Sequence, residues 1–394
     1  YIIRSKRRSR KMSKLDELIK ELCPNGVESM TFEDVCDYEQ PGKYIVENTN
    51  YSDEFKTPVL TAGQTFILGY TNETDGIYQA SKSKPVIIFD DFTGAFKWVD
   101  FPFKVKSSAM KLLTPNGKAL LRYIFHYMGC LNFSSDEHKR LWIAIYSKFK
   151  IPVPPLEIQE EIVRILDKFT SLTAELTAEL TARRKQYEYY RDSLLTRDRP
   201  KTQWKELQEI AEIGTGSCNT NEAEENGEYP FYVRSPEVLR KNSFDYDETA
   251  IITAGDGVGV GKVFHYVEGK YALHQRAYRI HITDKNVIPR YYYHYMKATF
   301  LNYILKEQFK ASVQSIRRPM LNKYPVPIPS LKVQEKIVNV LDNFDSICMD
   351  LKIGLPAEIE ARKKQYEYYR DLLLTFANSG NTILSEQNRT EQMK

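Results

Sequence analysis

A long amphipathic pattern occupies the middle of the chain. Between Glu157 and Thr196 the apolar residues recur at steps of three or four, which is the spacing of one face of an α-helix. The stripe consists of Ile158, Ile162, Ile165, Phe169, Leu172, Leu176 and Leu180, and Tyr187, Tyr190 and Leu194 continue it. No glycine or proline interrupts these residues. At about 1.5 Å per residue, the pattern predicts a helical rod about 60 Å long.

A second stripe lies near the C-terminus and predicts a partner for the first. It consists of Val333, Ile337, Val340, Leu341, Phe344, Ile347 and Leu351. Gly354 and Pro356 follow, so a bend or a stop is expected there. A long rod with one apolar stripe needs another stripe to cover it. We therefore expect these two helical arms to pair as an intramolecular antiparallel coiled coil.

The segments in front of the arms have a different pattern. Residues 28–150 and 200–325 contain short β-branched runs, turns rich in Gly, Asp and Asn, and a few helical stretches, which predicts an α+β fold with mixed sheets. A short helix is expected after Met12, where Leu15, Leu18, Ile19 and Leu22 have helical spacing. Prolines in residues 151–156 and 326–331 are expected to block strand pairing and then to permit a helix start.

The chain is an internal repeat. Residues 182–196 recur as residues 361–375 at an offset of 179, and residues 158–169 recur as residues 333–344 at an offset of 175. The variable segments are weakly alike as well, because residues 123–128 echo residues 291–296. The order is therefore variable unit, helix, variable unit, helix, which predicts a pseudo-twofold arrangement.

A four-residue unit is doubled inside the first arm. It consists of Thr173, Ala174, Glu175 and Leu176, followed by the identical Thr177, Ala178, Glu179 and Leu180. Each unit adds about 6 Å of helix, and a coiled coil can absorb such an insertion. The doubling is either a slip in an ordinary Leu-rich helix or a ruler that sets the distance between the two variable units.

Length and charge add a hint about the partner. The chain has 394 residues, which predicts two or three domains, and a formal net charge of +4. Residues 1–11 hold six basic residues and no acidic ones, so the remaining chain carries −2. We interpret residues 1–11 as a leader outside the fold; the alternative is a flexible basic arm on DNA phosphates.

The charge of the remaining chain swings from acidic to basic twice. Residues 28–81 and 200–269 carry −8 and −7, whereas residues 82–150 and 270–325 carry +7 and +9. Local basic faces decide phosphate binding, so a near-neutral total does not exclude a polyanion partner. The alternative is that these sequence segments are not faces of the fold, but the repetition favours the first interpretation.

Neither a membrane nor a disulfide framework is expected. No apolar run approaches the ~20 residues that cross a bilayer, and the basic start has no apolar stretch behind it. The cysteines form no C-x-x-C pair, so a zinc ribbon is not expected and a reducing cytoplasm is favoured. They are Cys23, Cys36, Cys130, Cys218 and Cys348.

No catalytic motif is convincing. The Asn/Asp-Pro-Pro-aromatic tetrad of DNA methyltransferases is absent, since Val153 precedes and Leu156 follows the one Pro-Pro pair. The glycine-rich residues 255–262 fail the phosphate-loop pattern at Asp256, and a strand-like run follows them, which predicts a hairpin. Asp256 with Glu268 and Lys270 matches a loose nuclease spacing that also arises by chance. His126 and His294 are interpreted as structural, and no metal site is expected.

The motifs of the arms carry a family resemblance. Each arm opens with Pro-Leu-x-x-Gln-Glu-x-Ile, in residues 155–162 and as a variant in residues 330–337. Each closes with Lys-Gln-Tyr-x-Tyr-Tyr-Arg-Asp, in residues 185–192 and 364–371. Over residues 12–376 the chain resembles the specificity subunit of a type I restriction–modification system. The doubled Thr-Ala-Glu-Leu unit resembles the sub-family that has this tandem spacer.

The resemblance implies a function in defence against foreign DNA. Each variable unit would be a target-recognition domain that reads one half of a bipartite double-stranded DNA site. The arms would set the spacer and dock two methyltransferase subunits, and motor–nuclease subunits would join the complex. No catalytic residue is expected on this chain. S-adenosylmethionine for adenine-N6 methylation would sit on the methyltransferase, and ATP and Mg on the motor–nuclease.

With this resemblance, the chain is expected to consist of seven segments. They are a basic leader (1–11), an N-terminal helix (12–27), target-recognition domain 1 (28–153), the first spacer arm (154–199), target-recognition domain 2 (200–328), the second spacer arm (329–376) and a C-terminal tail (377–394).

Side-chain chemistry indicates which residues could contact DNA. Donors and acceptors read base edges, whereas Lys and Arg also bind phosphates. The candidates in the first unit are Asp90, Asp91, Thr93, Lys97, Trp98, Lys104, Lys106, Ser107, His138, Lys139 and Arg140. Those in the second unit are Lys262, His274, Gln275, Arg276, Gln314, Ser315, Arg317 and Arg318. For each, a solvated side chain or a local cap is the alternative.

Two other classes of function stay open at this point. One is a self-sufficient DNA-modifying or DNA-cutting enzyme, against which the missing tetrad argues. The other is a coiled-coil adaptor that does not read sequence. Methyl transfer by the isolated chain would favour the first, and a DNA footprint without two separate protected blocks would favour the second.

Overall fold

The computed structural model describes residues 13–63, 65–131, 133, 140–196, 202–307 and 315–376. The chain forms two compact units. Unit 1 contains the residues up to Glu175 together with those from Glu360 on, and unit 2 contains Leu176–Ile359. The leader 1–11 and the tail 377–394 lie outside the described residues. Within the described ranges, no helix is both long enough and apolar enough to span a bilayer.

Unit 1 contains three small sheets. Their orders are β2-β8-β5-β6, β4-β3-β7 and β1-β9, and only the β3–β7 pair is parallel. The strands are β1 (Ser29–Thr31), β2 (Cys36–Glu39), β3 (Thr57–Leu60), β4 (Ile67–Thr71), β5 (Val86–Asp90), β6 (Phe96–Val99), β7 (Lys104–Val105), β8 (Met110–Pro115) and β9 (Lys150–Pro152). The helices that begin in this unit are α1 (Lys14–Leu22), α2 (Phe32–Val35), η1 (Gly42–Tyr44), α3 (Leu121–Met128), α4 (Leu141–Ala144), η2 (Tyr146–Lys148) and α5 (Leu156–Thr196).

Unit 2 contains a larger sheet of order β11-β16-β14-β15-β12-β13 and the pair β10-β17. The strands are β10 (Gln203–Glu206), β11 (Ala211–Thr215), β12 (Tyr229–Tyr232), β13 (Val238–Lys241), β14 (Tyr246–Ala254), β15 (Phe264–Leu273), β16 (Ala277–Ile282) and β17 (Pro325–Ile328). The helices are α6 (Leu207–Ile210), η3 (Thr220–Glu222), α7 (Pro289–Glu307), α8 (Arg318–Asn322) and α9 (Leu331–Met349), and α10 (Leu355–Leu374) begins here and continues in unit 1.

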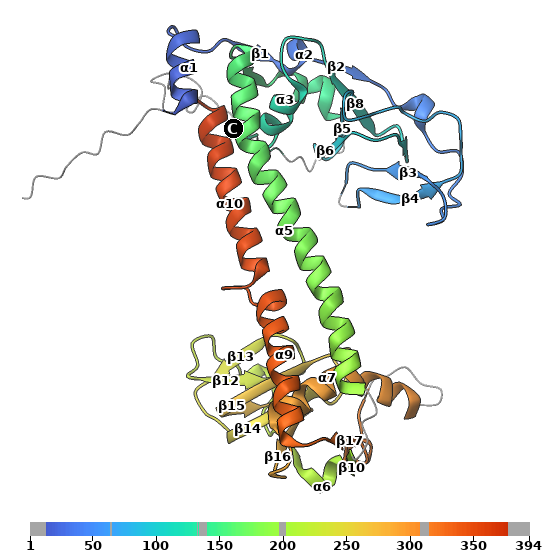
Figure 1. Ribbon diagram of the computed structural model, residues 1–394, viewed down its shortest axis with the longest axis vertical. Coiled ribbons are helices and arrows are strands. Elements are labelled where there is room, and N and C mark those ends of the chain that lie inside the picture. The colour runs from blue at the N-terminus through green and yellow to red at the C-terminus, as the bar shows by residue number, and fades with distance from the viewer. Residues whose placement is uncertain are drawn as a thin grey trace, which may run out of the picture. The chain divides into compact units, whose positions relative to one another are not determined.

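The repeat in the sequence is a repeat in the fold. The order β2-β8-β5-β6 in unit 1 matches β11-β16-β14-β15 in unit 2. Figure 1 labels β2, β8, β5 and β6 in unit 1 and β16, β14 and β15 in unit 2. The register agrees too, because Ile87 lies opposite Leu113 and Ile251 lies opposite Ile280. The predicted α+β class is therefore confirmed.

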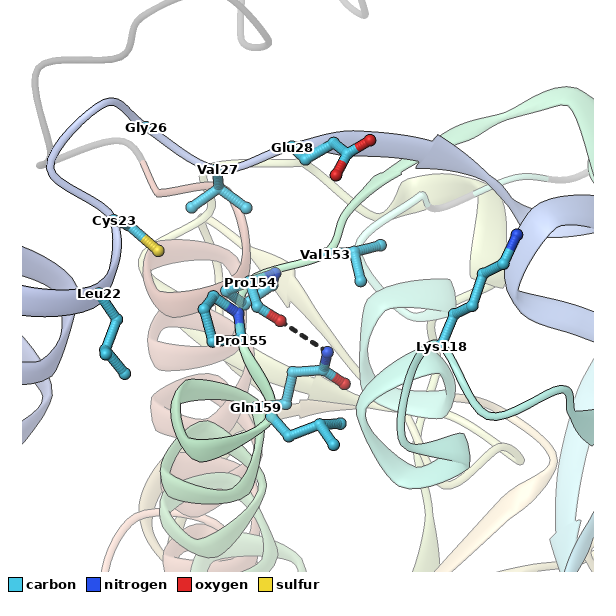
Figure 2. A pocket seen from close by; sticks show the side chains of 11 residues that line it. Leu22, Cys23, Gly26, Val27, Glu28, Lys118, Val153, Pro154, Pro155 and Gln159 are labelled. Atoms are coloured by element: carbon cyan, nitrogen blue, oxygen red, sulfur yellow. Dashed lines mark hydrogen bonds between the residues drawn. The ribbon is translucent and has the colours of Figure 1, made fainter.

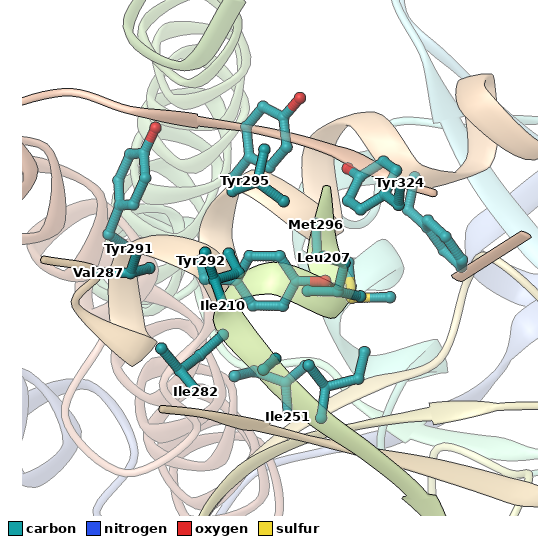
Figure 3. Close-up of a cluster of buried hydrophobic side chains, with 14 of the residues drawn as sticks. Leu207, Ile210, Ile251, Ile282, Val287, Tyr291, Tyr292, Tyr295, Met296 and Tyr324 are labelled. Atoms are coloured by element: carbon teal, nitrogen blue, oxygen red, sulfur yellow. Dashed lines mark hydrogen bonds between the residues drawn. The ribbon is translucent and has the colours of Figure 1, made fainter. Parts of the chain in front are cut away.

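Each unit is held together by a core of aliphatic and tyrosine side chains. In unit 2, Tyr291, Tyr292 and Tyr295 project from α7 into a cluster with Ile251 and Ile282 of the sheet (Figure 3). Two of these tyrosine hydroxyls find backbone acceptors, whereas that of Tyr292 lies 3.3 Å from the sulfur of Met296. Tyr291 donates to the carbonyl of Pro327 at 3.1 Å, and Tyr295 donates to that of Pro325 at 3.0 Å. Polar ends bonded in this way let large rings fill the core without a desolvation penalty.

The first arm is one uninterrupted helix of 41 residues, as its pattern predicts. In unit 1, Phe169 of α5 stacks on Tyr369 of α10, with ring centroids 5.3 Å apart. In unit 2, α5 packs against α9, where Tyr187 and Tyr190 both contact the ring of Phe344. The second arm is broken between Met349 and Leu355, as expected from the glycine and proline there.

The prolines before each arm correct one expectation. Pro152 belongs to β9 and lies opposite Ser29, and Pro325 and Pro327 belong to β17, which pairs with β10. These prolines do not block pairing, because each strand has only one partner and proline is tolerated at such an edge.

A glutamine fixes the start of each arm. Gln159 is buried, donates to the Pro154 carbonyl at 2.8 Å and accepts from the amide of Leu120 at 2.9 Å. Figure 2 shows this side chain beside a small pocket where α5 begins. Gln334 repeats the arrangement with the Pro329 carbonyl and the amide of Ile288, both at 2.8 Å. This contact explains the glutamine in the repeated arm motif.

Candidate nucleic-acid interface

In unit 2, three candidate segments meet at one edge of the sheet. The loop after β14 begins at Gly255, whose amide donates to the Arg276 carbonyl at 2.9 Å. The carbonyl of Gly255 accepts from the amide of Ile316 at 2.7 Å, and the backbones of Asp256 and Ser315 form an isolated antiparallel β-bridge. The loop after β14, the turn before β16 and the segment before α8 therefore form one continuous surface.

Unit 1 builds the same edge from the corresponding segments. The amide of Asp91, just after β5, donates to the Ala109 carbonyl at 2.9 Å, and the Asp91 carbonyl accepts from the amide of Leu141 at 2.8 Å. These contacts bring the loop after β5, the turn before β8 and the segment before α4 together. The two units thus place candidates at matching positions of the fold.

Polar and cationic side chains line the edge in unit 2. Lys262, Gln275, Ser315, Arg317 and Arg318 are exposed, and the Arg318 side chain also donates to the Ile213 carbonyl at 2.8 Å. A groove of about 570 Å³ lies beside them, lined by residues that include Arg234, Asp256 and Lys262.

Asp256 binds two arginines at the rim of this groove. Its Oδ1 accepts from Nη1 of Arg234 at 2.5 Å, and its Oδ2 accepts from Nη1 of Arg276 at 3.1 Å. Partial burial opposes ionisation of Asp256, but the two guanidinium groups hold the pKa of its carboxyl below the usual value. The sequence does not single out Arg234, because this residue lies in the turn between β12 and β13 with no motif around it.

Several predicted DNA contacts prove to be structural in unit 1. Asp91 is 1% exposed, pairs with the buried Lys111 at 3.1 Å and accepts from the amide of Trp142 at 2.8 Å. Lys104 is 3% exposed and binds Glu73 at 2.8 Å. Burial keeps both from reaching DNA in this conformation, which corrects those two expectations.

Two further candidates have local roles. Asp90 Oδ1 accepts from the amides of Phe92 and Thr93, at 2.9 and 2.8 Å, and so caps the turn between β5 and β6. His274 in unit 2 is buried, and its Nδ1 accepts from the amide of Arg276 at 3.0 Å, which fixes the turn that carries Arg276. Burial, followed by the charge of Arg234, lowers the pKa of His274, so it stays neutral near pH 7.

The remaining first-unit candidates divide into two groups. Thr93, Lys106, Ser107 and Arg140 are exposed. Lys97 and Trp98 lie half-buried in β6, where the guanidinium of Arg122 sits 4.8 Å from the Trp98 ring. His138 and Lys139 of the first unit and Gln314 of the second unit lie outside the described residues.

A repeated polar joint attaches each α/β body to its arm. In unit 1, Asp167 of α5 accepts from Arg122 at 2.8 Å and from Nε2 of the buried His126 at 2.9 Å. Nδ1 of His126 lies 2.9 Å from the hydroxyl of Tyr366, which belongs to α10. This geometry assigns the neutral tautomer with the proton on Nε2. Burial lowers the pKa of His126 although Asp167 opposes the shift.

Unit 2 repeats the joint with Asp342, Arg290 and His294. Asp342 lies 2.9 Å from Nε of Arg290 and 2.7 Å from Nε2 of His294. His294, Asp342 and Asp345 are also close enough to hold a cation. Arg290 and Lys297, the latter 3.8 Å from Asp345, already neutralise those carboxylates, so we do not propose a metal there. The structural interpretation of both histidines fits these contacts.

The nuclease-like triplet is not assembled. Glu268 lies opposite Thr249 and Lys270 opposite Asp247, whereas Asp256 follows the far end of β14 at Ala254. The strand between Thr249 and Ala254 alone spans about 16 Å. These groups therefore cannot share one metal ion or one phosphate.

Comparison with known proteins gives a consistent picture. The family model described as "Type I restriction modification DNA specificity domain" matches residues 24–183 and 201–361. The specificity subunit of the type I restriction enzyme EcoR124I/EcoR124II from Escherichia coli is 43% identical, over 93% of this chain and 98% of that protein. A putative type I specificity subunit from Haemophilus influenzae is 30% identical, over 80% and 86%. The crystal structure of a type I S subunit from M. genitalium has the same fold, with a TM-score of 0.62 at 15% identity, over 89% of this chain and 97% of that one.

Proposed function

This chain belongs to the family of type I restriction–modification DNA specificity subunits, and from this premise we propose that each unit reads one half of a bipartite double-stranded DNA site. The chain is the non-catalytic specificity subunit of a type I enzyme complex. The observation that supports two reading heads is the repeated edge, where the same three segments converge in unit 1 and in unit 2. Two equivalent surfaces suit two half-sites, as in other proteins whose repeats mirror their DNA.

The exposed members of each edge are the proposed contacts. In the first unit they are Thr93, Lys106, Ser107 and Arg140. In the second unit they are Lys262, Gln275, Arg276, Ser315, Arg317 and Arg318. Amide and guanidinium groups can pair with base edges in the major groove, and the lysines suit phosphates.

Reconstitution tests this function. The chain would be combined with methyltransferase subunits and S-adenosylmethionine, and methylated adenines would be mapped on a random DNA library by single-molecule sequencing. We expect one bipartite site with two fixed half-sites and a gap, and no methylation by the chain alone. Activity of the isolated chain would support a self-sufficient enzyme, and methylation without a fixed sequence would support an adaptor.

We also propose that the arms dock the two methyltransferase subunits. The repeated arm motif places a tyrosine pair on each arm, Tyr189 with Tyr190 and Tyr368 with Tyr369. In each pair the second ring stacks on a phenylalanine of the facing helix, and the first is largely exposed, 69% for Tyr189 and 64% for Tyr368. Exposed tyrosines on a rigid helix are typical anchors of protein interfaces.

Single substitutions test the docking surfaces. Tyr189→Ala and Tyr368→Ala should each weaken the binding of one of two methyltransferase subunits, which analytical ultracentrifugation would show as a shift from two bound subunits towards one. Trp204→Ala is the control, because this ring is 56% exposed but lies outside the arms. Equal stoichiometry in all three variants would contradict the proposal.

The cofactors and the remaining partners are part of the same proposal. S-adenosylmethionine would be held by the methyltransferase subunits, and ATP and Mg by motor–nuclease subunits that join the complex. The cytoplasm is the proposed location, which suits the five free cysteines.

The doubled spacer unit is proposed as a ruler of the sub-family with tandem Thr-Ala-Glu-Leu repeats. Leu180 is buried against Cys348 and Ile359, with Leu176 packed beside them, whereas Thr177 and Glu179 are exposed. One four-residue unit therefore contributes one buried leucine and one helical turn. Adding or removing a unit rotates the following helix by only about 40°, so the apolar stripe keeps its face.

A further inference from the structure

The glycine-rich loop after β14 does not bind phosphate by a known pattern, yet its geometry is specific. A Cβ on Gly255 would lie 2.7 Å from the Arg276 carbonyl oxygen, and one on Gly259 would lie 2.5 Å from that of Arg234. Both contacts are too short for any side chain. Gly257, between them, has φ +79°, which favours glycine. These glycines allow the loop to pack directly on the two turns that carry the arginines.

Asp256 occupies the centre of this arrangement. One carboxylate oxygen binds Arg234 and the other binds Arg276, so each guanidinium is held at one nitrogen. Side-chain exposure is 24% for Asp256, 39% for Arg234 and 61% for Arg276. The Asp256 side chain is therefore mostly covered, while most of the Arg276 side chain faces solvent.

This arrangement suits a base better than a phosphate. A carboxylate between two arginines lowers the local positive charge, which weakens phosphate binding. It also fixes the orientation of the guanidinium plane, which a bidentate contact requires. Arginine has five N–H donors, and in the described part of the chain Asp256 takes one from Arg276. The fork that is left matches O6 and N7 of guanine in the major groove.

We propose that Arg276 reads a guanine in the half-site bound by unit 2, and that Asp256 is the positioning residue that aims it, with Arg234 holding the other carboxylate oxygen. This inference rests on the proposed function and deepens it. The role of the glycine-rich loop is then to bring Asp256 between two arginines from separate turns.

The test uses the complex with methyltransferase subunits and a DNA library randomised in both half-sites. The variants are Arg276→Lys, which keeps the charge but loses the fork, and Asp256→Asn, which keeps the shape but loses the charge. Arg240→Lys is the matched control, since Arg240 donates to the carbonyls of Gly227 and Glu228 elsewhere in unit 2.

We expect the wild-type complex to require guanine at one position of the second half-site. Arg276→Lys should reduce that preference by about 5- to 150-fold, the range of one bidentate contact. Asp256→Asn should relax the same position, and Arg240→Lys should leave it unchanged. The preference in the first half-site should persist in every variant, which shows that the chain is folded.

Three results would overturn the inference. The first is a second half-site without a fixed guanine. The second is an Arg276→Lys variant that methylates less but keeps its base preference, because this is the behaviour of a phosphate contact. The third is relaxation at different positions in Arg276→Lys and Asp256→Asn. A wild-type complex that methylates no bipartite site would instead refute the proposed function, and the inference with it.

Discussion

Replacing Asp91 with alanine should destabilise unit 1 far more than the loss of an ordinary ion pair. Asp91 and Lys111 are 1% and 0% exposed, with Nζ and Oδ2 3.1 Å apart. The substitution leaves the lysine charge buried without its partner and the Trp142 amide without its acceptor. Removing one partner of a buried pair costs about 3–5 kcal/mol. Because about 1.4 kcal/mol is a factor of ten, protection of the surrounding core should fall by roughly 100- to 4000-fold.

Hydrogen exchange followed by mass spectrometry measures the loss of amide protection around Asp91 within the whole chain. Amides of β5 and β8 should exchange faster in Asp91→Ala, and amides of β14 and β16 in unit 2 serve as the internal reference. Glu33→Ala is the control, because it removes an exposed pair with Lys148, in which the side chains are 46% and 58% exposed. Such pairs contribute about 0–1 kcal/mol.

A double variant separates the effect of the unpaired lysine charge from that of the unpaired Trp142 amide. Asp91→Leu with Lys111→Met removes both charges and should recover much of the lost protection, leaving the cost of the unpaired Trp142 amide. A change below tenfold in Asp91→Ala, or an equal change in both units, would refute the reasoning.

Three further predictions concern the polar joints, the Glu161 carboxylate and the doubled spacer unit. Asp167→Asn should weaken recognition of one half-site and Asp342→Asn recognition of the other, because each carboxylate joins one α/β body to an arm; binding to DNA with single half-site changes measures this. Hydrogen bonds from Arg164, which has the larger effect, and from Lys14 overcome burial and lower the pKa of Glu161 to about 2. The ionised Glu161 carboxylate therefore stabilises the fold above about pH 4.5, and this stabilisation is lost as the pH falls towards 2. The difference in unfolding free energy between wild type and Glu161→Gln should shrink over that range. Deleting residues 177–180 removes about 6 Å of helix and should shorten the methylated gap by one or two base pairs with both half-sites unchanged, whereas Thr177→Ala with Glu179→Gln should keep the gap; altered half-site letters would contradict the ruler.

The helical arms were predictable because their information is local. An apolar residue every three or four positions, with no glycine or proline, specifies an amphipathic helix, and α5 follows that pattern from Leu156 to Thr196. The repeat added the matching α/β topology without any contact being known. The roles of Gln159 and Asp167 were within reach too, since Gln334 and Asp342 recur at the same offset, but recurrence alone does not reveal a hydrogen-bond partner.

The interface was only partly predictable, because burial is not local. Asp91 and Arg140 were both candidate DNA contacts by their chemistry, yet Asp91 is buried and Arg140 is exposed. Arg234 carried no signal, because its partner Asp256 lies 22 residues away and is reached through a turn of the sheet. The expectation that the prolines of β9 and β17 block strand pairing was wrong, because an edge strand tolerates proline whereas a central strand does not. Which strands lie at an edge is not a local property of the sequence.

The sequence by itself determined the class of fold, the internal repeat, the two helical arms and the family resemblance, all of which depend on periodicity and on motifs that recur along the chain. Only the tertiary structure decided which charged side chains face solvent, that three separate segments share one edge in each unit, and that Asp256 lies between two arginines. The physical reason is that the free energy of a charged group depends on its neighbours in space. Those neighbours come from turns far apart in the chain, and their meeting is set by strand register and packing rather than by local sequence.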